Sequence, residues 1–188
     1  MKKWVFILLL STVGVQAQQD SAAVRKNELR IDLLSLIASS KLNLSYERFL
    51  NRSFSVGLTG SYADSKSVNE DFDSGYRSTL PKLEVIPYVR YNLSKGKAGY
   101  YFAEAFASAN SGDYRETVRL TDTNGNGYYT VKKDSYFDVA LGGGLGYKMY
   151  FGEKIAAELL VGFGSNLIDK SKSPDVISRV GLSVGYRF

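Results

Sequence analysis

The last eleven residues of the chain alternate strictly between apolar side chains and small or charged ones. Val180, Leu182, Val184, Tyr186 and Phe188 share one parity, and arginine, glycine or serine stands between them. Successive side chains of a β-strand point to opposite faces of its sheet, so this segment predicts a strand with one apolar face. A chain built from such strands must close its sheet into a barrel or pack the apolar face against a second sheet.

Seven further segments alternate in the same way, which predicts an all-β chain of eight antiparallel strands. The expected strands are 28–35, 41–49, 53–62, 80–91, 99–108, 136–150, 154–164 and 178–188. The connections after the second, fourth and sixth strands are short, whereas those after the third, fifth and seventh are long and polar. This rhythm is typical of an up-and-down transmembrane barrel, whose periplasmic turns are short and whose outer loops are long. Pro87 lies inside the fourth strand and lacks an N–H donor, so we expect a β-bulge there.

The first seventeen residues have the features of a secretory signal peptide. Lys2 and Lys3 precede an apolar run at 4–10, and small residues lead up to Ala17. The run is shorter than the roughly 20 apolar residues that span a bilayer, so we predict a cleaved signal peptide over 1–17. A short periplasmic segment over 18–27 and a barrel over 28–188 are expected to follow. The chain has no cysteine, which excludes disulfides and a lipid-modified cysteine.

The polar parity of the eight strands carries charges that balance. The predicted inward residues are Arg30, Lys82, Arg90, Lys148, Arg179 and Arg187, with Asp32, Glu47, Glu84, Glu104, Asp138 and Glu158. An eight-stranded barrel is just wide enough inside for side chains, and a neutral charge network fills it without an unpaired buried charge. We therefore predict a plugged lumen. A narrow pore is one alternative, because glycine and serine on this face could admit water, and a soluble exported β-sandwich that acts as a binding protein is another.

Aromatic residues gather beside the short turns and the carboxy terminus, as expected for a girdle at a membrane interface. They are Phe49, Phe54, Tyr91, Tyr100, Tyr101, Tyr147, Tyr150, Phe151, Tyr186 and Phe188.

Three stretches carry a resemblance to known proteins. Residues 27–36 read NELRIDLLSL, residues 44–50 read LSYERFL and residues 55–58 read SVGL. They resemble a small family of exported outer-membrane barrels of unknown function, and the last strand resembles the closing strand of such barrels. The resemblance implies an outer-membrane location in a Gram-negative-type cell, and it implies that Tyr186 and Phe188 form the signal read by barrel assembly machinery. It supplies no catalytic residues.

The composition argues against an enzyme. The chain contains no histidine, which removes Ser-His catalysis and the commonest zinc ligands. We predict no cofactor and a structural or surface-recognition role through the outer loops. The net charge of +5 does not indicate nucleic-acid binding, because basic outer loops that face anionic lipopolysaccharide account for it equally well. The loop cations are Lys66, Arg77, Lys132, Lys133, Lys170 and Lys172.

The longest outer loop contains one motif with metal-ligand spacing. Asp122, Asn124 and Asn126 match the opening of an EF-hand loop, but Lys133 stands where a bidentate glutamate belongs. We favour a hairpin tip over a calcium site, with 118–120 and 128–131 carrying strands five and six beyond the membrane.

The fifth strand suggests a partner. If Glu104 points inward, then Ala103, Ala105 and Ala107 point outward and present small side chains to the membrane. Small residues let another protein approach closely, so this face is a candidate contact of an accessory subunit with a larger membrane complex.

Overall fold

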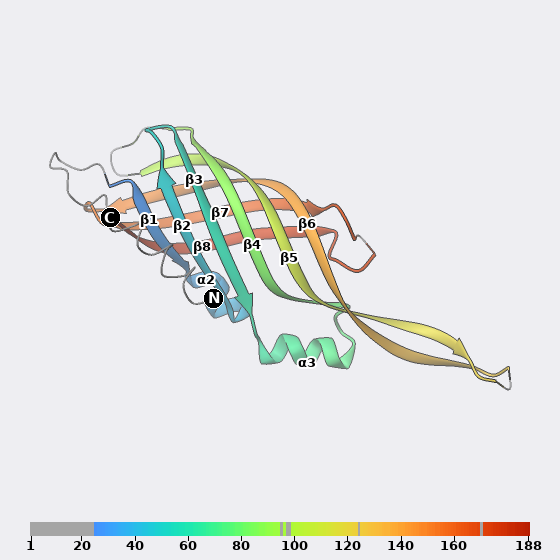
Figure 1. Ribbon diagram of the computed structural model, residues 1–188. Coiled ribbons are helices and arrows are strands. Elements are labelled where there is room, and N and C mark those ends of the chain that lie inside the picture. Colours follow the sequence, from blue (N-terminus) through green and yellow to red (C-terminus); the bar gives the residue numbers. More distant parts are fainter. Residues whose placement is uncertain (1–24, 95, 97–98, 124, 170) are drawn as a thin grey trace, which may run out of the picture.

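The computed structural model describes residues 25–188 apart from 95, 97–98, 124 and 170, so the predicted signal peptide lies outside the described residues. Eight antiparallel strands pair with their neighbours in chain order, and the first also pairs with the last, which closes the barrel (Figure 1). The strands are β1 (Asn27–Asp32), β2 (Lys41–Phe49), β3 (Phe54–Ala63), β4 (Thr79–Asn92), β5 (Gly99–Thr121), β6 (Gly127–Phe151), β7 (Ile155–Asn166) and β8 (Val176–Arg187). The predicted eight-stranded up-and-down barrel is confirmed, and the alternative of a β-sandwich is wrong.

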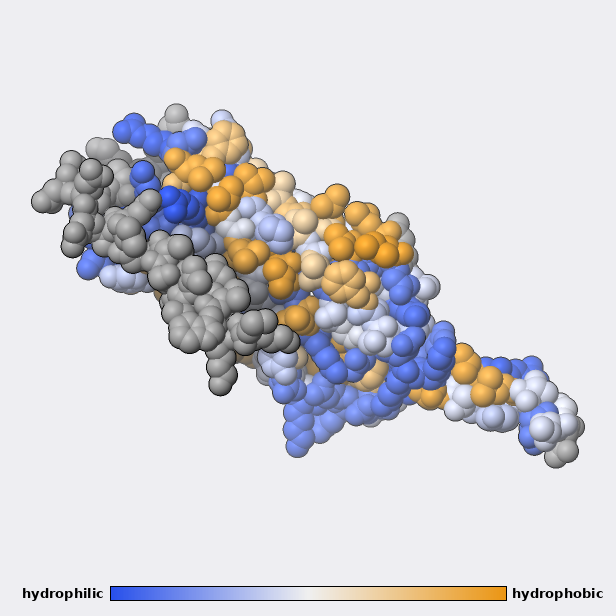
Figure 2. Space-filling model, viewed as in Figure 1, coloured by the Kyte–Doolittle hydropathy of each residue, from blue (hydrophilic) through white to orange (hydrophobic). Residues whose placement is uncertain are grey.

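The barrel is polar inside and apolar outside. Arg90 and Lys148 are almost fully buried, whereas Leu145 on the outer face of β6 is 62% exposed. Apolar side chains gather along the barrel wall (Figure 2). This inverted distribution fits a barrel surrounded by lipid, because the outer face meets hydrocarbon and the inner face can satisfy polar groups.

None of the helices in the described part of the chain is long and apolar enough to span a bilayer.

The closing strand pairs as its position predicts. Tyr186 lies opposite Leu29 of β1 and Ile155 of β7. Beyond it, the Phe188 N–H donates to the Asn27 carbonyl at 2.9 Å, and the Asn27 N–H donates to the Phe188 carbonyl at 3.1 Å. The chain terminus is therefore hydrogen-bonded to the first strand, with the aromatic side chains outward.

The predicted first strand is too long. It ends at Asp32, and helix α2 (Leu33–Ser39) follows. The Asp32 carboxylate accepts hydrogen bonds from the backbone N–H groups of Leu34 at 3.0 Å and Ser35 at 3.3 Å, as an N-cap does. Residues 33–37 contain consecutive apolar residues that break the period of two, so the cap determines the local structure.

A second helix, α3 (Lys66–Ser74), lies in the long loop between β3 and β4, where no helix was predicted. Its one buried residue is Phe72, and it ends at Gly75, whose φ is +88°. Glycine adopts this left-handed conformation without steric cost, so Gly75 is the sequence signal that could have marked the end of the helix.

Strands β5 and β6 continue beyond the barrel as a two-stranded ribbon (Figure 1). Pairing of β5 with β4 ends at Tyr114, and pairing of β6 with β7 ends at Ala140, but β5 and β6 pair with each other as far as Thr121 opposite Gly127. The predicted continuation of these strands through 118–120 and 128–131 is confirmed.

The expected bulge at Pro87 is wrong. The register between β4 and β5 is the same on both sides of it, with Val85 opposite Ala109 and Tyr88 opposite Phe106. The missing N–H of Pro87 interrupts the pairing with β5 without shifting it. The register instead shifts between Pro81 and Leu83.

Only part of the predicted aromatic girdle lies on the outer face of the barrel. Phe54 packs on Tyr91 with ring centroids 5.0 Å apart, and Tyr101 packs on Tyr147 at 4.6 Å. Three of the predicted members point inward instead, because they share the parity of inward charges. They are Phe49, Tyr100 and Tyr150.

Candidate functional site

The centre of the lumen is occupied by Arg90 of β4. Its guanidinium donates two hydrogen bonds to the Glu158 carboxylate, at 2.7 and 2.8 Å. It also contacts Glu104 at 2.7 Å and Glu47 at 2.8 Å. These acids come from three other strands, so one arginine links β2, β5 and β7 across the barrel. Two-point contact between guanidinium and carboxylate adds geometric specificity to the charge attraction.

Two further cations complete the same layer. The Lys148 ammonium lies 2.8 Å from Glu28, 2.9 Å from Glu47 and 3.2 Å from Glu158. The Arg30 guanidinium contacts the same three carboxylates, at 2.8 Å from Glu28 and 3.5 Å from Glu158. Sequence reasoning missed Glu28, although it shares the parity of Arg30. We call the residues of this buried network the plug: Glu28, Arg30, Glu47, Arg90, Glu104, Lys148, Glu158 and Arg179, which pairs with Glu104.

The three acids also have the spacing of a metal site. Glu28, Glu47 and Glu158 each offer a carboxylate oxygen, and these atoms lie within 4.8 Å of one another. The nitrogen atoms of Arg30 and Lys148 contact all three acids. The cations of the chain therefore already supply the positive charge that a metal would bring.

Aromatic rings line the plug. The Arg90 guanidinium lies 4.2 Å from the ring centroid of Phe102 and 4.6 Å from that of Tyr88, and Arg179 lies 4.9 Å from that of Phe106. Glycine makes room for these rings. A Cβ on Gly146 would stand 2.2 Å from the Phe102 ring, which is closer than real contacts allow. Inward glycines thus permit large side chains to meet in a narrow barrel.

The other predicted charges lie nearer the barrel ends, and all of them except Arg187 have their partners outside the plug. Besides its capping bonds, Asp32 accepts a hydrogen bond from the backbone N–H of Leu182 at 3.2 Å. Glu84 pairs with Lys41, which was not predicted, at 2.8 Å. Arg187 lies 3.8 Å from Glu28 at the end near the termini.

Asp138 organises the loop between β7 and β8. Its carboxylate accepts from the backbone N–H groups of Ile168 and Asp169, both at 2.9 Å, and from the Ser173 hydroxyl at 2.5 Å. The predicted single network is therefore a central plug with separate anchors around it.

The predicted inward position of Lys82 is wrong. The side chain is half exposed and pairs with Asp113 at 2.5 Å. The register shift between Pro81 and Leu83 falls at this residue and turns it out of the lumen, so strict alternation fails here.

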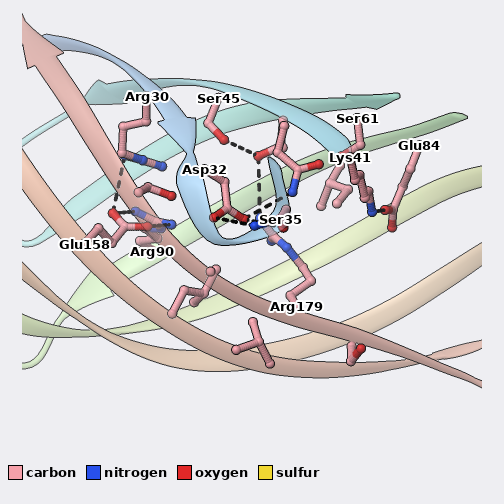
Figure 3. Close-up of a pocket in the computed structure, with 18 residues that line it drawn as sticks. Arg30, Asp32, Ser35, Lys41, Ser45, Ser61, Glu84, Arg90, Glu158 and Arg179 are labelled. Atoms are coloured by element: carbon pink, nitrogen blue, oxygen red, sulfur yellow. Dashed lines mark hydrogen bonds and ion pairs between the residues drawn. The ribbon is translucent and has the colours of Figure 1, made fainter. Parts of the chain in front are cut away.

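Little free space remains inside the barrel. Figure 3 shows a cavity between the layer of Arg30, Arg90 and Glu158 and the pair of Lys41 and Glu84. Its volume is about 60 Å³. That is room for about two waters at roughly 30 Å³ each. A larger cavity of about 590 Å³ lies farther out, among α2, α3, β4 and β8.

The motif in the longest loop forms the tip of the ribbon. The Asp122 N–H donates to the Asn126 carbonyl at 2.8 Å, and Gly125 has a φ of +82°. The Asp122 carboxylate accepts from the Thr123 N–H at 2.7 Å. Asn124 lies outside the described residues. The favoured hairpin tip is therefore present.

Several loop cations have acidic partners. Lys133 donates to Asp73 at 2.7 Å, and Lys172 donates to Asp134 at 2.9 Å. The hydrogen bond from Lys133 lowers the pKa of Asp73, and that from Lys172 lowers the pKa of Asp134. Lys170 lies outside the described residues. These pairs connect the β5–β6 ribbon to α3 and to the loop before β8.

Comparisons with known proteins agree with this architecture. The chain matches the model of the family described as "Protein of unknown function (DUF3575)" over residues 4–174. No curated protein matches it. The N-terminal β-barrel domain of Pseudomonas aeruginosa OprF is 13% identical with a TM-score of 0.51, and the match covers 87% of this chain and 98% of that one. At such identity the likeness shows the fold alone.

Two further solved structures have lower TM-scores. Neisserial surface protein A is 12% identical with a TM-score of 0.47, over 87% of this chain and 94% of that one. Ail, the attachment invasion locus protein of Yersinia pestis, is 11% identical with a TM-score of 0.46, over 88% of this chain and 100% of that one.

Proposed function

The chain belongs to the DUF3575 family, and we propose that it is a non-enzymatic outer-membrane barrel with a plugged lumen that acts in recognition at the cell surface. In this proposal the short turns and both termini face the periplasm, and the outer loops face the exterior. Assembly machinery engages the strand that ends in Tyr186 and Phe188, and exposed loop cations such as Arg77 contact lipopolysaccharide phosphates.

The β5–β6 ribbon is the observation that carries the surface role. It extends past the rest of the barrel and exposes large side chains, including Tyr129, Tyr128 and Leu120. Its outer part pairs with no other strand among the described residues, so both of its edges offer free backbone groups. Such edges are templates for pairing with another chain, and exposed aromatic side chains are common anchors in interfaces.

Orientation and recognition can be tested with two single-cysteine variants, since the chain has no native cysteine. We expect a membrane-impermeant maleimide to label Tyr129→Cys on intact cells and to spare Lys154→Cys at a short turn. A photo-crosslinker placed at the same two positions should then give a defined adduct from 129 only. Labelling of position 154 alone would contradict the orientation, and a ribbon without any adduct would contradict the recognition role.

The plug supports a closed lumen over the rival reading of a narrow pore. Its charges come from strands on opposite sides of the barrel and hold one another in ion pairs across the axis. Conduction would require these buried pairs to separate, and leaving a buried charge without its partner is strongly unfavourable. Planar-bilayer recordings distinguish the two, because a pore gives stable ohmic steps.

A second role, as an accessory subunit of a larger membrane complex, is favoured by the outer face of β5. Ala103, Ala105 and Ala107 point outward, and Ala105 lies opposite Gly143 of β6. This row buries little surface in lipid, whereas small side chains allow close approach of another protein. Photo-crosslinking from position 105 should capture a protein, and the matched position Leu182 on β8 should capture lipid. Lipid adducts alone from 105 would contradict this role.

A further inference from the structure

The barrel wall is incomplete near its outer end, between β8 and β2. The pairing of β1 with β8 ends at Asp32 opposite Ser183, and its pairing with β2 ends at Ile31 opposite Leu44. Farther out, β8 continues to Val176 with β7 as its only partner, and β2 begins at Lys41 with β3 as its only partner. No strand therefore fills the space between these two edges, which we call the lateral gap.

Helix α2 covers this gap, and its N-cap Asp32 accepts hydrogen bonds from the Leu182 N–H of β8 and from the Asn43 amide of β2. It contacts both β8 and β2, but within the described residues no backbone hydrogen bond joins it to either strand. None of its residues is buried, and Ile37 is 83% exposed. Its sequence is nevertheless apolar, with Leu34, Leu36 and Ile37 exposed at the rim. An exposed apolar segment at the edge of the membrane is suited to contact with hydrocarbon.

The larger cavity opens at the same gap. Both faces of β8 line it, since Ile177 points into the barrel while Val176 and Val180 point outward. The cavity therefore reaches around the unpaired edge of β8 and joins the inside of the barrel mouth to its outer wall. Apolar residues dominate this part, including Leu34 and Ala38 of α2 and Leu80 of β4.

Positive charge lies at the other side of the cavity. Arg77 and Lys82 line it; Lys82 is paired with Asp113, whereas Arg77 forms no ion pair with any described residue. Deeper in, Lys41 is neutralised by Glu84 at 2.8 Å. An apolar channel from the membrane that meets an exposed guanidinium suits a ligand with a hydrocarbon chain and an anionic head. The volume of about 590 Å³ falls within the range of roughly 300–1,000 Å³ that small-molecule sites occupy.

We propose that the outer mouth of the barrel binds a single-chain anionic amphiphile of the long-chain fatty acid type, which enters from the membrane through the lateral gap beneath α2. The chain lies along Ala38 of α2 and Ile177 of β8, and the carboxylate faces Arg77. The plug closes the route farther inward, so the mouth is a binding site and not a passage.

The test uses the full chain in phosphatidylcholine nanodiscs with a photoactivatable palmitate. We expect saturable adducts on α2 and the outer part of β8. Ala38→Trp fills the cavity and should weaken palmitate labelling about tenfold, a factor that lies within the range of typical overpacking costs. Ile37→Trp is the matched control on the same helix, outside the cavity, and should label like the wild type. Arg77→Ala should weaken labelling about two- to fivefold, as loss of an exposed ion pair does.

Heat-modifiable gel mobility shows which variants fold, and Val176→Trp replaces Ala38→Trp if the latter does not. Adducts spread evenly over the outer wall, with no effect of either tryptophan at the gap, would overturn the proposal. The assignment of an anionic head would be overturned if photoactivatable hexadecanol labelled the protein as strongly as palmitate does and if Arg77→Ala changed neither level of labelling.

Discussion

The plug and the outer end of the barrel satisfy their polar groups in different ways. In the plug every residue except Arg179 lies where its strand pairs with both neighbours, and the charges satisfy one another across the lumen. At the outer end, by contrast, strand pairing is interrupted at several places. Strand β1 ends at Asp32, the wall is open beside β8, and β5 and β6 extend from the barrel as a ribbon. Side chains then take over the role of the ladder, as Asp32 and Asp138 do by accepting backbone N–H groups.

This difference leads us to expect that the plug determines stability and that the outer end determines binding. We expect the inner part to be rigid, because its polar groups have few alternative partners once water is excluded. The outer part can vary because its polar groups can exchange protein partners for water. We therefore expect substitutions in the plug to affect stability, and substitutions in the outer part to affect binding.

The largest effect is expected for Arg90→Ala. It removes the cation shared by Glu47, Glu104 and Glu158 and should lower the free energy of unfolding by about 3–5 kcal/mol, as loss of one partner of a buried pair does. Lys82→Ala, on the same strand but in an exposed pair, should cost at most about 1 kcal/mol. Urea unfolding in lipid vesicles measures both, and equal losses would remove the distinction between plug and rim.

A smaller effect is expected from filling the space beside Phe102. In Gly146→Val the new Cβ would lie 2.2 Å from the Phe102 ring. Overpacking of this kind costs about 1–3 kcal/mol. Gly143→Ala is the matched control on the outward parity of the same strand, where a Cβ meets only the Glu104 carbonyl at 3.3 Å. It should change the free energy of unfolding by no more than about 0.5 kcal/mol.

Removing the ribbon should leave the barrel nearly intact. We expect deletion of residues 116–132, closed by a two-residue Asn-Gly turn, to preserve heat-modifiable mobility and to change the free energy of unfolding by less than about 1 kcal/mol. The deleted segment pairs with no other strand of the barrel wall in the described part of the chain. A deletion variant that cannot fold would show that the ribbon is part of the structural core.

The smallest effect is expected when the pH is lowered. Hydrogen bonds from Lys133 and Lys172 lower the pKa values of Asp73 and Asp134, so these pairs stabilise the loops above the ordinary aspartate pKa. That contribution is lost as the pH falls through the lowered values in the folded protein. Hydrogen exchange at α3 and at the loop before β8 should therefore accelerate in acid before exchange in the barrel strands does. Simultaneous loss of protection in both regions would contradict this order.

The sequence was informative where alternation is uninterrupted. The parity of Arg90, Glu47 and Glu158 placed them on the inner face, and the same rule would have placed Glu28 there. Parity gives the face but not the height along the barrel axis, so the contact of Arg90 with Glu158 could not be read from the chain. That contact depends on the stagger of β4 against β7.

Prediction failed where a local preference overrides the alternation. Asp32 caps a helix where the apolar residues after it suggested more strand, and the shift beside Pro81 turns Lys82 outward. Both features lie at the outer end, in the part that we propose to bind ligands. Departures from a simple pattern are expected where function competes with stability.

If the charged plug closes the lumen, the purified protein should not conduct ions across a planar bilayer. We expect no stable conductance for the wild type, and ohmic steps for the Arg90→Ala variant if it retains the heat-modifiable mobility of a folded barrel. Stable ohmic steps from the wild-type protein would contradict a closed lumen.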